Sequence, residues 1–151
     1  MKRALLAACV VAALALPAGA AAKIVLQRGI GGVSLGMTEA KVRSALGRPA
    51  RVKNAKNEFG PYRVLFYARV KVTFQGLTTV TAVETTSTQE RTTTGIGVGS
   101  TKADVKAKVP GVVCETGHCH IGKFNPGARV TDFFIGTTGR VTRVVVGFVI
   151  D

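Results

Sequence analysis

The chain has 151 residues, 46% of them apolar, and its 21 Lys and Arg against 8 Asp and Glu give a formal charge of +13. This length suits one compact domain, and no apolar run reaches the length of a membrane-spanning helix, so we expect no integral membrane segment. The charge promotes contact with polyanions such as anionic lipid or polymer, although charge alone selects no partner.

The first 22 residues have the pattern of a secretory signal peptide. Lys2 and Arg3 form a basic start, residues 4–16 form an apolar run, and residues 17–20 offer a small-residue cleavage site. We therefore expect removal of residues 1–22, which leaves a secreted, periplasmic or cell-surface protein. Without Lys2 and Arg3, the chain has 19 basic and 8 acidic residues, and its formal charge becomes +11.

Cys9 allows a second interpretation, because residues 6–9 look like the site at which bacterial lipoproteins are acylated. Only five residues separate Arg3 from Cys9, and the apolar run continues past it. That spacing is shorter than the apolar region of a signal peptide. We therefore expect ordinary cleavage, which removes Cys9.

An internal repeat is the most informative feature of the remaining chain. Residues 32–42 and 95–105 each contain a short apolar stretch, a glycine, a threonine and the start of an amphipathic helix. The similarity resumes at residues 80–83 and 141–144, Val-Thr-Ala-Val and Val-Thr-Arg-Val. Duplicated units commonly stack to bury a shared apolar face. We predict an α+β fold of two tandem repeats, each a short helix packed on an antiparallel sheet, forming one continuous sheet.

The repeats are expected at about residues 29–87 and 93–151, within a single domain over residues 23–151. In the first repeat, a helix is predicted to begin at its N-cap Thr38 and to end at Gly47, ahead of Pro49. Its apolar side chains are expected on one face: Val42, Ala45 and Leu46. Because two or three turns are unstable alone, this helix must pack on an apolar surface.

Alternating side chains predict strands at residues 63–68 and 70–75, followed by a third strand at residues 79–85. If the first two strands pair, one face is expected to carry Val64, Phe66, Ala68, Val70, Val72 and Phe74. The opposite face is then expected to carry Arg63, Leu65, Tyr67, Arg69, Lys71, Thr73 and Gln75. Tyr and Arg are enriched at interface hot spots, so we select Arg63, Tyr67, Arg69, Lys71 and Gln75 as binding-face candidates. A plain solvated sheet face remains the alternative.

Residues 85–94 carry no apolar side chain and are expected to form a solvated connection or strand edge. In the second repeat, a helix is predicted over residues 101–109. Its strands are expected at residues 111–114, 118–124, 129–135 and 140–150. The last of these is almost continuously apolar and is expected to lie centrally in the sheet.

Cys114 and Cys119 would remain after signal removal, and an even pair in an exported protein favours a disulfide. His118 and His120 complete the pattern C-x3-H-C-H, which raises a zinc or copper site formed by Cys114, His118, Cys119 and His120. Adjacent residues on a strand point in opposite directions, so these four donors converge poorly on one ion. We favour the disulfide and keep the metal site as the alternative.

Residues 33–49 resemble a motif of the small outer-membrane-assembly lipoproteins (the SmpA/OmlA, or BamE-type, family). There a glycine-Met-Thr element, here residues 36–38, opens a helix that ends in Leu-Gly-x-Pro, here residues 46–49. The tandem doubling is similar to the secreted β-lactamase-inhibitor proteins, whose concave sheet grips a partner protein. These resemblances imply a helical layer on an antiparallel sheet and a binding scaffold without a defined target. The second copy departs from the motif, since Ser100 replaces Met37 and the Leu-Gly-x-Pro ending is absent.

No catalytic constellation is visible. The acids are scattered singly, the only two histidines are two residues apart, and the glycines at 95, 97 and 99 lack the spacing of a dinucleotide fingerprint. We therefore expect a non-enzymatic protein without a cofactor. Our first hypothesis is an exported module that binds an envelope or secreted protein. The second is an envelope protein that binds anionic lipid or polymer, with nucleic acid not expected, and the third is a metal-binding protein.

Overall fold

The computed structural model describes residues 24–150, so the expected signal peptide at residues 1–22 lies outside the described residues. Two sheets and two helices make up this part of the chain. In chain order the elements are β1 (Ile24–Val25), β2 (Gly29–Ile30), β3 (Val33–Ser34), α1 (Glu39–Leu46), β4 (Arg51–Asn57), β5 (Gly60–Phe66), β6 (Lys71–Gln75), β7 (Ala82–Thr85), α2 (Lys102–Lys108), β8 (Val113–Cys114), β9 (His118–Ile121), β10 (Arg129–Ile135) and β11 (Val141–Phe148). No helix within residues 24–150 has the length and apolar character needed to cross a membrane.

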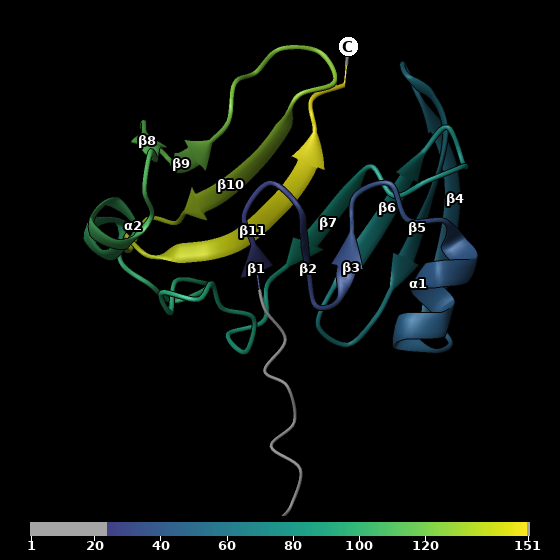
Figure 1. Cartoon of the computed structure of the whole chain (residues 1–151), viewed down its shortest axis with the longest axis horizontal. Coiled ribbons are helices and arrows are strands. Elements are labelled where there is room, and N and C mark those ends of the chain that lie inside the picture. The colour runs from purple at the N-terminus through teal and green to yellow at the C-terminus, as the bar shows by residue number, and fades with distance from the viewer. Residues whose placement is uncertain (1–23, 151) are drawn as a thin grey trace, which may run out of the picture.

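The larger sheet has eight antiparallel strands in the order β4-β5-β6-β7-β11-β10-β9-β8. The α+β class is therefore confirmed, with one continuous sheet running through both halves (Figure 1). The small separate sheet β1-β2-β3 was not predicted. The last strand, β11, lies between β7 and β10, as its apolar sequence predicts. The order is symmetric about the β7–β11 pair, so each half contributes four neighbouring strands and one helix.

The recurring motif forms the same backbone connections in both halves. Gly36 donates its N–H to the Val80 carbonyl at 2.9 Å, and Gly99 donates to the Val141 carbonyl at 2.7 Å. Both glycines have a positive φ, 83° and 92°, which is accessible to glycine without the strain that a Cβ would add. The motif thus joins the segment before each helix to the residues at or just before the start of the last strand of its half. That the halves arose as tandem repeats stays a prediction.

Both helices begin as predicted. The Thr38 hydroxyl accepts from the Lys41 N–H, and the Thr101 hydroxyl forms a reciprocal capping box with Asp104. Gly47 ends α1 with a φ of 77° and donates its N–H to the Arg43 carbonyl. Within α1 the expected apolar face is partly wrong, because Val42 is buried and Leu46 half-buried while Ala45 is exposed.

The predicted facing of β5 and β6 is wrong. Leu65 pairs with Val72, and both are 0% exposed in the core, whereas Val64 pairs with Thr73 on the other side. The connection over residues 67–70 sets this register, which places even-numbered residues of β5 opposite odd-numbered residues of β6. Because side chains alternate along a strand, a one-residue change of register moves every side chain to the other face.

Two further segments differ from expectation. The strand β4 was not predicted, because its residues are mostly polar. It tolerates this composition because it lies at the sheet edge and pairs only with β5. Residues 85–94 are not simply solvated, since Thr85, Glu90 and Thr92 are 1%, 0% and 7% exposed. The Thr92 hydroxyl accepts from the Ile96 N–H at 3.0 Å, and the Arg91 carbonyl accepts from the Ile24 N–H at 2.8 Å. These bonds satisfy the Thr92 hydroxyl and the Arg91 carbonyl and tie the segment to β1.

Candidate functional site

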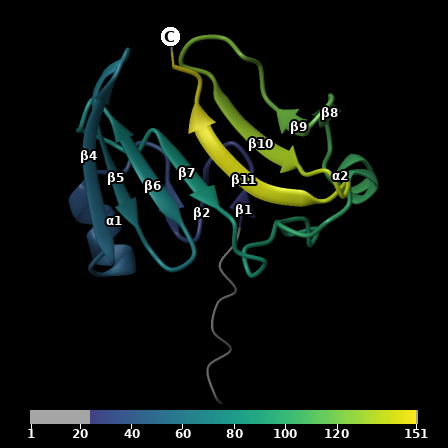
Figure 2. The ribbon, with the colours of Figure 1, turned by 180° about the vertical axis from the view of Figure 1, so that it is seen from behind.

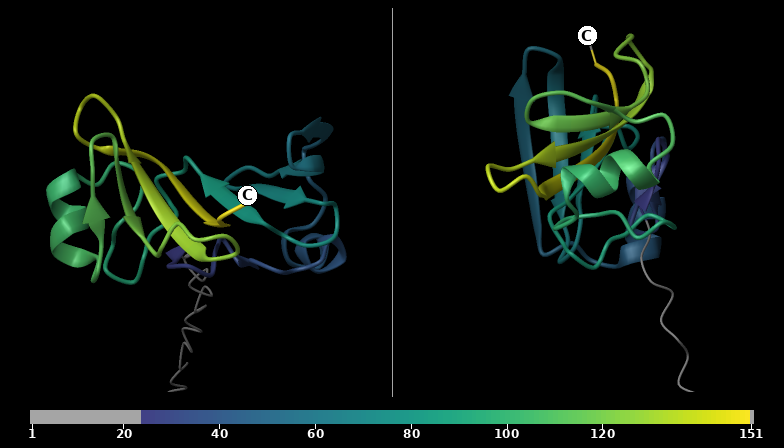
Figure 3. Two further views of the ribbon diagram at one scale, coloured as in Figure 1. Left: turned by 90° about the horizontal axis from the view of Figure 1, so that it is seen from above. Right: turned by 90° about the vertical axis from the view of Figure 1, so that its left-hand side faces the viewer.

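One face of the eight-stranded sheet is left uncovered by the elements formed within residues 24–150. The covered face carries the core, and its central side chains are 0% exposed: Leu65, Val72, Val83, Phe133 and Val144. Both helices and the small sheet β1–β3 lie on that covered side (Figure 2, Figure 3). We call the other side the open face. Its side chains, placed by the strand register, include Arg51, Lys53, Tyr62, Val64, Phe66, Lys71, Thr73, Gln75, Glu84, Arg143, Val145, Asp132, Phe134, His118 and His120.

Arginine and phenylalanine pairs are repeated on the open face. The Arg51 guanidinium lies 3.9 Å from the centroid of the Phe66 ring, and Arg143 lies at the same distance from Phe134. A cation over a ring face is attracted by the negative potential of the ring, which favours this position of each guanidinium. The open face therefore presents cationic groups that lie against aromatic rings.

Only part of the positive charge on the open face is neutralised by a neighbouring acid. Glu84 accepts ion pairs from Lys71 at 2.8 Å and from Arg143 at 3.7 Å. Arg51 and Lys53 have no carboxylate within ion-pair distance among residues 24–150. The β4 end of the open face is thus its most basic part.

The binding-face candidates selected from the sequence do not share one surface. Lys71 and Gln75 lie on the open face, and the Gln75 amide is held by hydrogen bonds to Asn57. Arg63 lies on the opposite side of β5, where it forms a 2.7 Å ion pair with Glu39 of α1. Hydrogen bonding to Arg63 lowers the pKa of Glu39. The sequence did not predict this division, because the division depends on the register between β5 and β6.

Tyr67 and Arg69, the other two candidates, lie at a cavity on the covered side. This cavity has a volume of about 230 Å³ and is lined by Gly31, Leu46, Tyr67, Ala68, Arg69, Val70 and Glu90. The Glu90 carboxylate is buried there, and neither of its oxygens has a hydrogen-bond partner. Arg69 lies 3.7 Å away with a half-exposed side chain. Burial raises the pKa of Glu90, and the charge of Arg69 opposes that shift.

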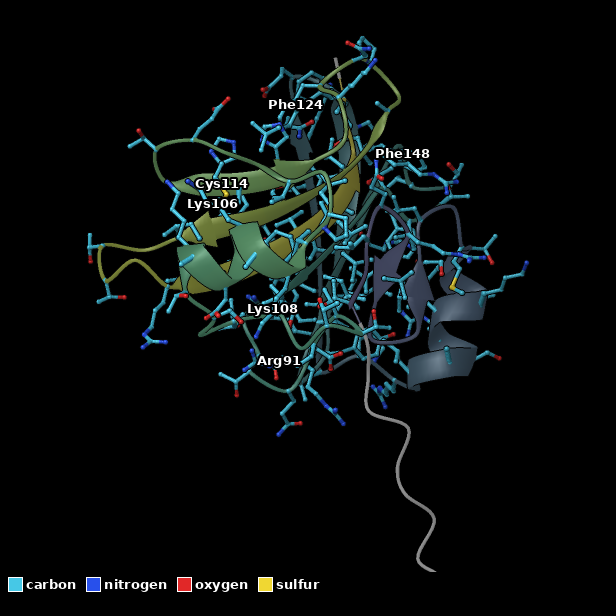
Figure 4. All side chains as sticks on the ribbon, turned by 60° about the vertical axis from the view of Figure 1, so that its left-hand side comes forward. Arg91, Lys106, Lys108, Cys114, Phe124 and Phe148 are labelled. Carbon is cyan, nitrogen blue, oxygen red and sulfur yellow. A yellow bond between two sulfur atoms is a disulfide. The ribbon has the colours of Figure 1, made fainter. Side chains whose placement is uncertain are left out.

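The disulfide expected between Cys114 and Cys119 is confirmed, and it joins β8 to β9 at a directly opposed strand pair. The two sulfurs are bonded to each other and cannot bind a metal as thiolates. The alternative metal site formed by Cys114, His118, Cys119 and His120 is therefore wrong for the two cysteines. Figure 4 shows Cys114 near α2 and Phe124 on the loop that follows β9.

The two histidines gather with an acid that the sequence did not reveal. His118 and His120 both project onto the open face, because residues two apart on a strand share a side. Asp132 of β10 lies directly opposite His120, and one ligand atom from each of the three residues lies within 4.8 Å of the others. Burial raises the pKa of Asp132, and the charge of His118 opposes that shift. The His-x-His spacing was the only sequence signal, since Asp132 is brought in by strand pairing.

Comparisons with known proteins define the fold but not a family. No protein-family model and no curated protein matches the chain. The structure is similar to an extracellular protein containing an SCP domain from Bacillus anthracis, with 10% sequence identity and a TM-score of 0.53. That match covers 76% of this chain but 44% of the other, so this chain spans less than half the length of that protein. The uncharacterized protein yfeY from Escherichia coli has 12% identity and a TM-score of 0.49, over 80% of this chain and 97% of that one.

Proposed function

We propose that this protein is an exported, non-enzymatic module that binds another envelope or secreted protein through its open face. The observation that carries the proposal is the uncovered side of the eight-stranded sheet, with its paired arginines and aromatic rings. Arg, Tyr and Phe are enriched at protein interfaces, and groups already ordered lose little conformational entropy on binding. The antiparallel sheet beneath them supplies a rigid base.

The charge of the open face indicates the chemistry of its partner. Arg51 and Lys53 lie beside the aromatic surface of Phe66 and Tyr62, whereas Glu84 is already engaged by two cations. An acidic surface with an apolar centre is therefore complementary to the β4–β6 part of the open face. Complementary charge accelerates the encounter, and the buried rings slow dissociation.

Export is supported by two features of different kinds. The Cys114–Cys119 disulfide is typical of proteins that fold in an oxidising compartment. The N-terminal sequence supplies the expected signal for secretion, with a periplasmic or cell-surface location as its consequence.

The proposal is tested by capturing proteins from a detergent-solubilised envelope fraction on the immobilised protein. The double variant R51A/F66A removes one ordered cation and its ring, and we expect it to reduce retention of a specific protein at least tenfold. The matched control is K41A/K106A, which removes two exposed cations from the helices on the covered side. A protein retained equally by both variants would exclude the Arg51–Phe66 part of the open face as its binding surface.

The overall charge favours a second candidate function, binding of anionic lipid or polymer. The chain without Lys2 and Arg3 has 19 basic and 8 acidic residues, and such attraction is screened by salt because Debye screening acts on exposed charges. Washing the captured material at low and then high salt separates the two functions. Release of all bound material by salt supports the polyanion function, whereas a protein retained at high salt supports the binding module.

A further inference from the structure

We propose that His118, His120 and Asp132 form a binding site for a divalent transition-metal ion, with Zn²⁺ as the ion that their chemistry fits best. The site lies on the β9–β10 part of the open face, away from the basic β4–β6 part. It goes beyond the proposed binding of a partner protein and does not depend on it.

Strand geometry brings the three donors together. His118 and His120 lie two residues apart on β9, and Asp132 is the direct cross-strand partner of His120 on β10. One ligand atom from each residue lies within 4.8 Å of the other two. Tetrahedral zinc, bound by nitrogen or oxygen at about 2.0–2.1 Å, requires its ligand atoms to be about 3.3 Å apart. The donor atoms therefore need to approach one another by no more than about 1.5 Å to reach the spacing of a zinc site.

An unpartnered buried nitrogen provides independent support. His120 is 8% exposed, and its Nδ1 atom is buried without a hydrogen-bond partner. Buried polar atoms are paired in the great majority of cases, so an unpaired one points to a missing ligand. A metal ion bound at this Nδ1 would satisfy it and place the imidazole proton on Nε2.

The surroundings favour a fixed site over a chance surface cluster. The Phe124 ring lies 4.7 Å from the His120 ring, and the two imidazoles stack with centroids 5.5 Å apart. The Cys114–Cys119 disulfide lies on the other face of the same strand and ties β9 to β8. These contacts restrict the donors before any ion binds, which reduces the entropy lost on binding.

The donor set limits the kind of ion. Both nearby cysteines are oxidised and supply no thiolate, so two imidazoles and a carboxylate are the protein ligands. Zinc accepts this set with a fourth position open to water, and Cu²⁺ or Ni²⁺ also favour imidazole. The positive charge of Arg143 acts on Asp132 and opposes the binding of a cation there. Its guanidinium lies over the Phe134 ring and 3.7 Å from Glu84, which partly neutralises it. Glu115, 3.8 Å from His118, adds a neighbouring negative charge.

Isothermal titration with ZnCl2 tests the site, using the full protein purified without a polyhistidine tag in a non-chelating buffer. We expect one equivalent of Zn²⁺ to bind, and the isosteric variant D132N to weaken the affinity at least tenfold. H118Q, at a half-exposed position, is expected to weaken binding to a similar extent. The matched control E58Q removes an exposed acid from the β4–β5 turn and is expected to bind like the parent protein.

A second measurement reports on the histidines directly. Zinc is expected to shift the imidazole NMR signals of both His118 and His120 in the parent protein, and D132N is expected to need a higher zinc concentration for the same shift. The unchanged dispersion of the remaining amide signals verifies that D132N is folded. Absence of saturable binding, or equal affinity for the parent, D132N and H118Q, would overturn the proposal.

Discussion

At the residue scale, Glu90 is an ionisable side chain in surroundings that disfavour its charged form. It lies in a segment without apolar side chains, yet its carboxylate is buried beside Val70 and Gly31 with no hydrogen-bond donor. Its neighbouring cation, Arg69, is 3.7 Å away and half-exposed, so solvent weakens the pair. Burial therefore dominates, and it raises the pKa of Glu90 above its ordinary value of 4.5.

The raised pKa predicts how stability depends on pH. The native state holds the Glu90 proton more tightly than the unfolded state, so this group stabilises the fold fully below its unfolded pKa. That contribution is lost as the pH rises through the raised native value. We expect E90Q, which remains neutral, to lose this dependence and to be more stable than the parent above the native pKa.

Urea unfolding of both proteins at a series of pH values measures the effect. The difference in free energy of unfolding between E90Q and the parent is expected to grow with pH. Asp132 is also shifted upwards by burial, but it is present in both proteins and cancels in the difference. A difference that stays constant with pH would contradict the prediction.

At the scale of single elements, the two helices differ in how firmly their first turns are capped. The Thr101 hydroxyl accepts from the Asp104 N–H at 3.1 Å, and the Asp104 carboxylate accepts from the Thr101 N–H in return. Thr38 accepts from the Lys41 N–H at 3.4 Å, and its third helical residue is a lysine that cannot reciprocate. The second helix is thus more dependent on its cap.

Replacing each threonine by alanine tests this difference. T101A is expected to lower the free energy of unfolding by about 1–2 kcal/mol, whereas T38A is expected to cost about 0.5–1 kcal/mol. The midpoint of urea unfolding measures both, provided that the dependence on urea concentration is unchanged. A larger loss for T38A than for T101A would show that the reciprocal bonds of the capping box do not make α2 more dependent on its cap than α1.

At the scale of the whole molecule, one apolar core runs through both halves. Buried side chains of the first half, Val72 and Val83, continue into Val144 and Phe133 of the second across the β7–β11 pair. No boundary in the sheet separates the halves, so we expect them to unfold in one cooperative transition.

A substitution in one half should therefore be detected by probes in the other. Both tyrosines, Tyr62 and Tyr67, lie in the first half, and the chain has no tryptophan. V144A, in β11, is expected to destabilise the protein by about 2 kcal/mol and to shift the tyrosine fluorescence and circular dichroism transitions together. A tyrosine transition that stays unchanged would mean that the halves unfold separately.

The candidate sites show where sequence reasoning ends. The His-x-His spacing places two imidazoles on one side of any strand, so that part of the donor set could be predicted from the sequence. Asp132 was not, because its approach to His120 depends on the pairing of β9 with β10. The division of Arg63 and Lys71 between opposite faces has the same origin, since alternation gives two faces but does not say how neighbouring strands align.

The sequence by itself determined the features that depend on neighbouring residues. Threonine caps, a glycine stop before proline and two cysteines separated by a short turn located both helices and the disulfide, because their interactions span only a few residues. The tertiary structure alone decided the strand register, the burial of Glu90 and the meeting of Asp132 with the histidines. Each of these depends on contacts between segments far apart in the chain, whose energies act only once the core has formed.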